Sequence, residues 1–207
     1  MNGPPMDELM AEFYMGEPGS DSAISLYDNT YFDIMDATTW AYNIDTIAQS
    51  LSNICRFNGH IANFYSVAEH AVRVAKLLKS WGANELVQFI GLHHDDMESI
   101  IGDIPSPHKR LMYIRTTDIT AESVHFFEKT LEYSFFRAIG VLAPTEITGN
   151  EGFAHDWEDV KRADVAVYLE ERAERPILGK GMTPARAKKE YLKMHNRLAL
   201  SLGLETE

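Results

Sequence analysis

The sequence is poor in cysteine and in positive charge. Cys55 is the single cysteine among 207 residues, which excludes a disulfide framework and a cysteine-rich zinc module and makes a reducing cytosol the expected setting. Nineteen Lys and Arg residues stand against 31 Asp and Glu residues, giving a formal net charge of −12. Duplex DNA and anionic membranes repel such a chain, so we expect neither a polynucleotide nor a membrane as partner.

Long apolar runs are missing as well. No stretch reaches the roughly 18 apolar residues of a membrane span, and the acidic N-terminal segment lacks the basic start of a signal peptide. We therefore expect a cytoplasmic protein. Residues 1–26 are rich in Gly and Pro, which predicts a flexible or loosely docked extension, and residues 27–207 are expected to form one domain.

No segment alternates with the period of a strand, whereas helical spacing recurs along the chain. Apolar residues with this spacing predict a first helix through Ile44, Ile47, Ala48, Leu51, Ile54 and Cys55. Arg56-Phe57-Asn58-Gly59 is its expected exit. Ser66-Val67-Ala68-Glu69 has the pattern of a capping box and predicts the start of a second helix.

Four further helices are expected. One starts at Asn84 and stops near Gly102, where a glycine and two prolines follow closely. Others are predicted over residues 118–139 and 156–173, and a last one after Thr183-Pro184, an N-cap followed by proline. The expected fold is an all-α single domain of roughly six main helices.

Four metal-capable side chains fall on the apolar faces of these helices: His70, His94, Asp95 and Asp164. An isolated carboxylate on a buried face is costly unless a compensating charge is present. A lone histidine of this kind is more often a core residue, and Asp164 could pair with Arg162 or Arg137. Taken together, two imidazoles and two carboxylates match the ligands of Zn, Mn, Fe or Co. The conjunction predicts a divalent metal centre.

Glu98 follows His94 by four residues, so a continuous helix would project it toward the same space. There it would handle a proton of a metal-bound water, whose pKa a metal lowers from about 15.7 toward 7. No Gly-rich phosphate loop, Rossmann fingerprint or nucleophile elbow competes with this site. The expected chemistry is hydrolytic.

His70, then His94-Asp95, then Asp164 resembles the H…HD…D signature of the HD-domain metal-dependent phosphohydrolases. The similarity extends roughly over residues 27–175. It includes the following segments: Ile44-Asp45-Thr46-Ile47-Ala48, Ile54-Cys55-Arg56-Phe57-Asn58-Gly59-His60, Phe64-Tyr65-Ser66-Val67-Ala68-Glu69-His70, His94-Asp95-Asp96-Met97-Glu98 and Ile101-Gly102-Asp103-Ile104-Pro105-Ser106-Pro107. The chain is most similar to the compact branch that contains bacterial 5'-deoxynucleotidases and phage dATP triphosphohydrolases.

The resemblance implies an all-helical HD-domain bundle with Zn, Co, Mn or Mg bound. It assigns the metal ligands (His70, His94, Asp95 and Asp164), the catalytic residues (Glu98 and Asp95) and the substrate-binding residues (Arg56, Phe57, Asp103, Pro107 and Lys109). The implied partners are a small (deoxy)nucleotide substrate and other copies of the same chain in a homo-oligomer. A phage origin would place the enzyme in the host cytoplasm.

Several residues keep a second interpretation. Arg56 could be an exposed helix-end cation, Asp103 a turn residue and Lys109 an isolated lysine. Phe57 stands where relatives often have Trp, which puts the contact with the base in doubt.

The signature itself leaves a choice, since relatives often have Leu-Leu-His-Asp-Ala where this chain has Leu92-His93-His94-Asp95-Asp96. We take His94 as the ligand because it directly precedes Asp95. His93 and Asp96 would then either recruit a second ion or be solvated neighbours, and we favour the latter.

Three functions fit these expectations. A dNTP triphosphohydrolase of the dATPase type is favoured, because Arg56 and Lys109 together suit a longer anionic tail. A 5'-deoxynucleotidase acting on dNMPs is the alternative within the same chemistry. A catalytically silent nucleotide-binding HD protein is the alternative of another class, and the loss of a ligand or of Glu98 would have been its sign.

Overall fold

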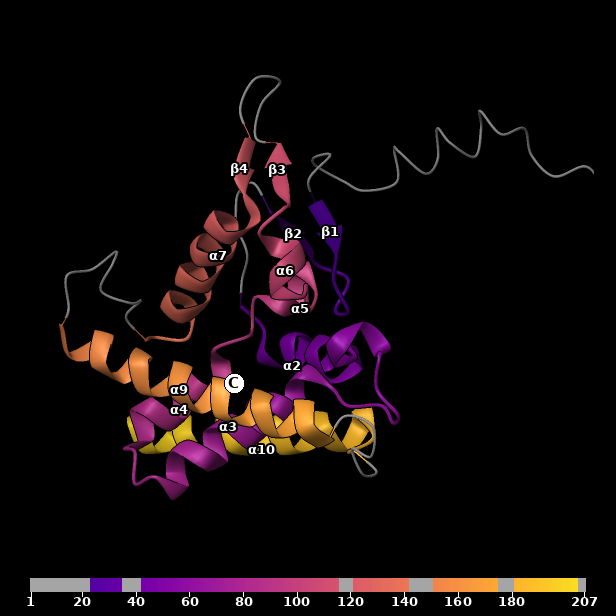
Figure 1. Cartoon of the computed structure of the whole chain (residues 1–207). Coiled ribbons are helices and arrows are strands. Elements are labelled where there is room, and N and C mark those ends of the chain that lie inside the picture. Colours follow the sequence, from indigo (N-terminus) through magenta and orange to yellow (C-terminus); the bar gives the residue numbers. More distant parts are fainter. Residues whose placement is uncertain (1–22, 35–41, 116–120, 142–150, 175–180, 205–207) are drawn as a thin grey trace, which may run out of the picture. The chain divides into compact units, whose positions relative to one another are not determined.

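The computed structural model describes residues 23–34, 42–115, 121–141, 151–174 and 181–204 (Figure 1). The chain divides into two compact units, Met1–Ala41 and Tyr42–Glu207. In the first unit, β1 (Ala23–Ser25) and β2 (Tyr31–Asp33) pair as an antiparallel hairpin with Ile24 opposite Phe32. The expected N-terminal extension lies outside the described residues, apart from residues 23–26.

The second unit is mostly helical, which confirms the all-α prediction. Its elements are α2 (Ile44–Asn53), η2 (Arg56–Gly59), α3 (Val67–Ser80), α4 (Glu85–His93), α5 (Glu98–Ile101), α6 (Ser106–Lys109), β3 (Tyr113–Arg115), β4 (Ala121–Ser123), α7 (Val124–Ala138), α9 (Glu151–Glu174) and α10 (Pro184–Leu202). None of the helices in the described ranges combines the length and the apolar run that crossing a bilayer requires.

Three helices start at the residues that the sequence predicts. Ser66, Asn84 and Thr183 each accept a hydrogen bond from a backbone N–H in the first turn of the helix that follows. Asn43, which was not predicted, does the same for α2. Such caps satisfy N–H groups that a helix leaves unpaired at its start. The carboxylate of Glu69 accepts instead from the backbone N–H of Met182 at 2.6 Å. It thereby ties α3 to the segment that precedes α10.

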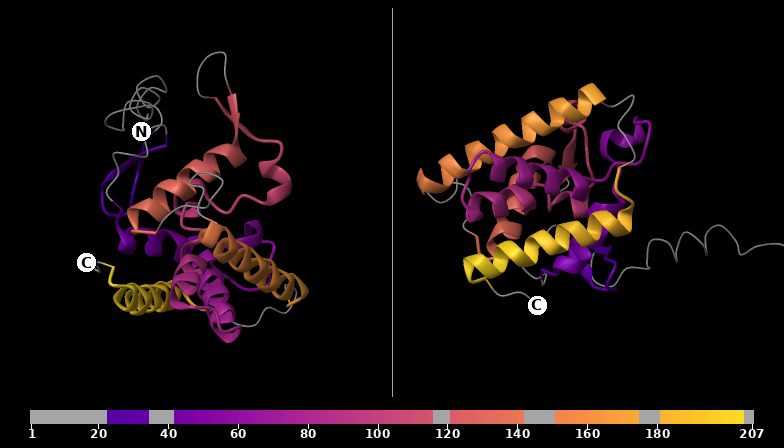
Figure 2. Two further views of the ribbon diagram at one scale, coloured as in Figure 1. Left: turned by 90° about the vertical axis from the view of Figure 1, so that its left-hand side faces the viewer. Right: turned by 90° about the horizontal axis from the view of Figure 1, so that it is seen from below.

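A shared apolar core packs α3 and α4 between α9 and α10 (Figure 2, right). Its most buried members include Val74, Leu78, Phe89, Ile90, Val160, Val167 and Leu198. Phe127, Phe135 and Phe136 of α7 are buried within the chain as well. The core holds together the three elements that carry the predicted metal ligands, because α3, α4 and α9 all pack against one another.

The expected helix from Asn84 to Gly102 is broken, and this prediction was wrong. α4 ends at His93, and α5 starts at Glu98. Between them the backbone N–H groups bond three residues back, from Asp96 to His93 and from Glu98 to Asp95. About three residues make a turn in such a segment, so side chains three apart lie above one another. We call residues 94–97 the ligand turn.

Three other boundaries differ from the prediction. The helix expected over residues 156–173 is α9, which already starts at Glu151. α2 ends at Asn53, and Cys55 pairs instead with Ser66 in an isolated bridge. The helix expected over residues 118–139 starts at Val124, because residues 121–123 form β4 and pair with β3. The segment around this hairpin is rich in β-branched residues, which favour strands.

Candidate metal centre and substrate cavity

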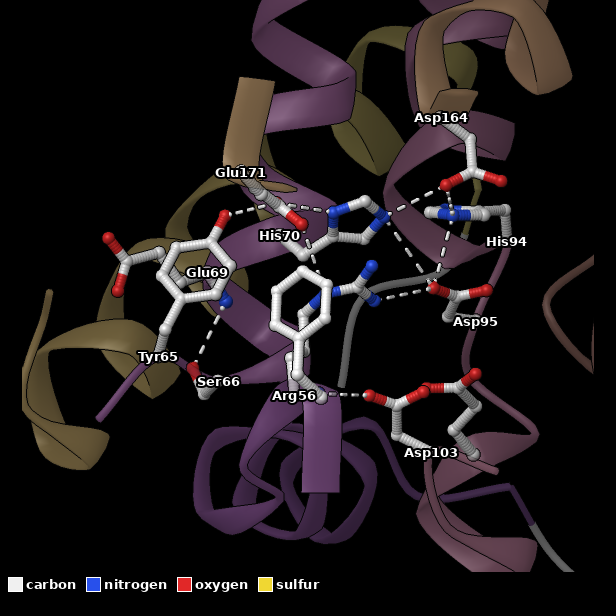
Figure 3. Close-up of polar contacts among 12 residues, drawn as sticks. Arg56, Tyr65, Ser66, Glu69, His70, His94, Asp95, Asp103, Asp164 and Glu171 are labelled. Atoms are coloured by element: carbon white, nitrogen blue, oxygen red, sulfur yellow. Dashed lines mark hydrogen bonds and ion pairs between the residues drawn. The ribbon is translucent and has the colours of Figure 1, made fainter. Parts of the chain in front are cut away.

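The four predicted ligands come together from three separate segments (Figure 3). His70 belongs to α3, His94 and Asp95 to the end of α4 and the ligand turn, and Asp164 to α9. His70 Nε2 lies 3.1 Å from Asp164 Oδ1 and 3.7 Å from Asp95 Oδ2. His94 Nε2 lies 3.1 Å from Asp95 Oδ2 and 3.7 Å from Asp164 Oδ1. The buried group of His70, His94 and Asp95 could hold a metal ion.

The hydrogen bonds of both histidines prepare them for this role. His94 Nδ1 lies 2.8 Å from the carbonyl oxygen of Gly91, and His70 Nδ1 lies 2.8 Å from Glu171 Oε1. A carbonyl oxygen and a carboxylate accept, so each Nδ1 carries a proton, and the Nε2 of the neutral ring is free to bind a metal ion. Both Nε2 atoms face the carboxylates of Asp95 and Asp164. This donor set fits a divalent cation.

The charges of the site favour a cation in the same place. Burial opposes ionisation of His94, but the charge of Asp95 and the hydrogen bonds with Asp164 and Asp95 raise its pKa to about 10. Burial also opposes ionisation of both carboxylates, yet the two histidines hold the pKa of Asp95 and that of Asp164 well below their usual range. Both aspartates are therefore ionised, and without a metal a proton on His94 balances them.

Glu171 is a site residue that the sequence analysis missed. It is fully buried and accepts from the hydroxyl of Tyr65 at 2.6 Å and from His70 Nδ1 at 2.8 Å. Burial opposes its charge, but the hydrogen bond from His70 and the nearby guanidinium of Arg56 lower its pKa. Glu171 follows Asp164 by seven residues, about two helical turns, and this spacing is the signal that could have identified it.

Arg56 is buried beside this carboxylate, so it is not an exposed helix-end cation. Its Nε lies 3.3 Å from Glu171 Oε2, and its Nη1 lies 3.7 Å from Asp95 Oδ2. Glu171 thus holds both His70 and Arg56, which fixes the guanidinium relative to the predicted metal ligands.

The loop after Arg56 has an unusual backbone. Phe57, Asn58 and Gly59 all have positive φ angles, of 58°, 50° and 75°. A residue other than glycine in this conformation costs on the order of 1–3 kcal/mol and persists where its surroundings hold it. Here the Phe57 N–H donates to Asp103 Oδ2 at 3.3 Å, and the Phe57 ring lies 6.0 Å from that of Tyr168. Asp103 therefore anchors the loop that presents Phe57.

A cavity of about 1640 Å³ opens over the predicted metal centre. Asp95, Glu98 and Asp164 line it, as do all five predicted substrate-binding residues: Arg56, Phe57, Asp103, Pro107 and Lys109. Basic side chains missed by the sequence analysis line it too, namely Arg110, Lys129 and Lys161. The fold thus brings every predicted site residue to one place, either along this cavity or, for His70 and His94, buried directly beside Asp95 and Asp164.

Glu98 and Lys109 face each other in the cavity wall. Glu98 is 4% exposed, and its Oε2 has no hydrogen-bond partner. Burial and the charges of Asp95 and Asp103 raise the pKa of Glu98 well above its ordinary value. Lys109 Nζ lies 3.8 Å from Glu98 Oε1 and forms a close ion pair with Glu128 of α7. Lys109 is therefore not an isolated lysine, and an anion bound to it competes with Glu128.

His93 and Asp96 are 2% and 1% exposed. The interpretation of these two residues as solvated neighbours was therefore wrong. They lie against α10 rather than in the cavity, since His93 and Asp96 contact Tyr191 and His93 contacts His195. His94 is the histidine whose Nε2 faces Asp95 and Asp164.

The curated proteins to which this chain is similar are uncharacterized. No family model matches it. The uncharacterized protein YfdR of Escherichia coli is 51% identical over 69 residues, which cover 33% of this chain and 36% of that protein. An uncharacterized protein of Rhodobacter capsulatus is 32% identical over 100 residues, covering 45% of this chain and 51% of that protein. The chain spans about half or less of the length of the curated relatives it matches.

Proposed function

We propose that this protein is a metal-dependent phosphohydrolase of nucleotides and that its substrate is a deoxynucleoside triphosphate, cleaved into deoxynucleoside and triphosphate. One observation carries the proposal. The Nε2 atoms of His70 and His94 and the carboxylates of Asp95 and Asp164 converge beside a cavity that also holds Arg56. The resemblance of these residues to the H…HD…D signature of HD-domain phosphohydrolases supports it.

A divalent ion (Zn, Co, Mn or Mg) bound here would polarise a phosphoryl oxygen and lower the pKa of a bound water toward about 7. His70, His94, Asp95 and Asp164 would hold it. Glu98 takes the proton of the attacking water, because its Oε2 has no other partner and its raised pKa makes the carboxylate a stronger base than an exposed glutamate. Arg56, fixed by Glu171, binds a phosphate of the substrate through its guanidinium.

The charge of the cavity supports a substrate with several phosphates. In a chain of net charge −12, five basic residues line this cavity: Arg56, Lys109, Arg110, Lys129 and Lys161. Six acidic residues line it as well: Asp95, Glu98, Asp103, Glu128, Glu132 and Asp164. The five cations offset all but one of these charges, and a bound divalent ion would tip the balance toward an anionic substrate.

The alternative substrate is a dNMP, and the ion pair between Lys109 and Glu128 favours it. A lysine that is already paired contributes less to holding a long phosphate tail. A silent nucleotide-binding protein is the alternative of a different class, which the intact ligand set and Glu98 argue against.

The test is a product assay on protein reconstituted separately with Co, Mn, Mg or Zn. The substrates are the four dNTPs, the four dNMPs and ATP, with nucleoside and phosphate products both followed by chromatography. The proposal predicts nucleoside and triphosphate from dNTPs, with dATP the first candidate. Release of orthophosphate from dNMPs would instead show that the protein is a 5'-deoxynucleotidase. Nucleotide binding without turnover under any metal would overturn both hydrolases.

A further inference from the structure

A second group of polar residues, four of them buried and Tyr42 partly buried, lies on the side of the ligand turn that faces away from the cavity. It consists of Tyr42, His93, Asp96, Tyr191 and His195, which we call the aspartate network. Tyr42 precedes α2, His93 ends α4, Asp96 lies in the ligand turn, and Tyr191 and His195 belong to α10. The network therefore joins the ligand turn to two elements that contribute no predicted ligand.

Asp96 is the centre of the network. Its Oδ2 accepts from the hydroxyl of Tyr42 at 2.9 Å and from His93 Nδ1 at 2.7 Å, and its Oδ1 accepts from the hydroxyl of Tyr191. His93 Nε2 lies 3.0 Å from His195 Nδ1. Both oxygens of Asp96 and both ring nitrogens of His93 are thus occupied within the protein. The network offers no free ligand to a second ion, and its polar atoms are satisfied as burial requires.

The network and the metal centre share one short stretch of backbone. Because the ligand turn has about three residues per turn, Asp96 lies above His93 on one side and Glu98 above Asp95 on another. His94 and Asp95 lie in the chain directly between His93 and Asp96. Fixing these two outer residues to α10 and to Tyr42 therefore fixes the direction in which His94 and Asp95 point.

The turn needs such an anchor. The helix is interrupted here, so the regular hydrogen bonds that hold a side chain's direction in α3 or α9 are replaced by three-residue bonds of poorer geometry. His70 and Asp164 lie inside long helices and are held by them. The two ligands on the ligand turn lack that support, and the aspartate network is the set of contacts that replaces it.

We propose that Asp96 is a positioning residue of the metal centre, acting through Tyr42, His93 and Tyr191 to hold His94 and Asp95 in the geometry that binds the ion. The inference rests on the proposed function in one respect, that His94 and Asp95 are metal ligands. It assigns no ligand or substrate contact to the network itself.

The test measures metal affinity without any nucleotide. Chelator-treated protein is titrated with Co²⁺ by calorimetry, for the wild type and for the variants Asp96→Asn and Tyr191→Phe. Loss of contacts that orient metal ligands typically costs 10–100-fold in affinity, so we expect Co²⁺ to bind at least about tenfold more weakly to both variants. Tyr191→Phe removes one hydroxyl at nearly constant volume, and it keeps the test decisive if Asp96→Asn does not fold.

Leu198→Ala is the matched control. Leu198 lies on α10 like Tyr191 and is fully buried in the apolar core, so its truncation should destabilise the same helix while it removes no hydrogen bond of the network. We expect this variant to unfold at a lower temperature while Co²⁺ affinity stays at the wild-type value. Wild-type Co²⁺ affinity in folded Asp96→Asn and Tyr191→Phe would overturn the inference, as would an equal loss in Leu198→Ala. Failure of nucleotide hydrolysis is a separate result, because no substrate enters this titration.

Discussion

The floor and the wall of the cavity are built in different ways. The floor consists of His70, His94, Asp95 and Asp164, whose directions are set by packed helices and by partners buried behind them, such as Glu171 and the carbonyl of Gly91. The wall consists of a loop with positive φ angles at Phe57 and Asn58, of short α6 and of side chains from α7 and α9. Several residues of the wall are exposed, including Pro107 and Tyr168.

This difference separates two roles. Groups that must be held to a fraction of an ångström are placed on rigid elements and supported from behind. Groups that contact a variable substrate lie on short elements and loops, where residues change without disturbing the core. Substitutions in the floor should therefore abolish metal binding and turnover with every substrate, whereas substitutions in the wall should change substrate preference.

The largest effect is expected from Asp95→Ala. Removing this carboxylate leaves His94 without its neighbouring charge and takes one ligand from the ion, so turnover should fall by roughly 10³-fold or more with every nucleotide. Steady-state hydrolysis in saturating Mn²⁺ measures it. Asp45→Ala, at an exposed position on α2, is the control and should keep wild-type turnover. Unchanged turnover in Asp95→Ala would remove this residue from the site.

His195 of the aspartate network, behind the floor, makes the stability of the folded protein depend on pH. Burial, and then the charge of His93, lowers the pKa of His195 to about 4, below the value of about 6.5 in an unfolded chain. The folded state thus disfavours protonated His195. The contribution of this residue to the free energy of unfolding is fully present above pH 6.5 and is lost as the pH falls toward 4. The loss amounts to at most about 3 kcal/mol.

Unfolding by denaturant between pH 7 and pH 4 measures this loss. His195→Gln should flatten the curve between pH 6.5 and 4, while substitution of the exposed His155 by Gln should leave it unchanged. Equal pH profiles for the wild type and His195→Gln would show that another group is responsible.

Glu171→Gln probes the support without altering a predicted ligand. The amide cannot hold the charge of Arg56 or the Nδ1 proton of His70 as a carboxylate does, so metal affinity should fall 10–100-fold, about 1.4–2.8 kcal/mol. Titration of chelator-treated protein with Co²⁺ measures the change in affinity. Glu170→Gln, one residue away and exposed, is the matched control. An affinity equal to that of this control would reduce Glu171 to a packing role.

The smallest effect is expected in the wall. Lys109→Ala removes a cation near the proposed phosphate site, so the KM for dNTPs should rise roughly tenfold, about 1.4 kcal/mol, with Co²⁺ affinity unchanged. The KM for dNMPs should rise less, because a single phosphate stays near the metal. Lys193→Ala, exposed on α10, serves as control. Loss of Co²⁺ affinity in Lys109→Ala would contradict the separation between wall and floor.

Local sequence signals predicted most of the helix starts and singled out the residues of the floor. Ser66, Asn84 and Thr183 cap helices because short polar side chains before an apolar run bond to the first turn. His70 and Asp164 stood out because polar groups on apolar faces need a partner. Both inferences depend on neighbours within a few positions in the chain.

The features that the sequence did not reveal depend on distant partners. Helix propensity alone does not predict the break after His93. Between Asn84 and Gly102 the segment contains no proline, and its one glycine, Gly91, lies inside α4. The burial of Asp96 follows from Tyr42 and Tyr191, which lie 54 and 95 residues away. Glu128 became a site residue only through its pairing with Lys109 across two helices.

The most direct test of the metal centre is an anomalous difference map from crystals grown with Mn²⁺. We predict a peak in contact with His70 Nε2, His94 Nε2 and the carboxylates of Asp95 and Asp164, with Asp96 still bonded to Tyr42 and Tyr191. The absence of a peak among these four residues, or a peak held by His93 and Asp96 instead, would contradict it.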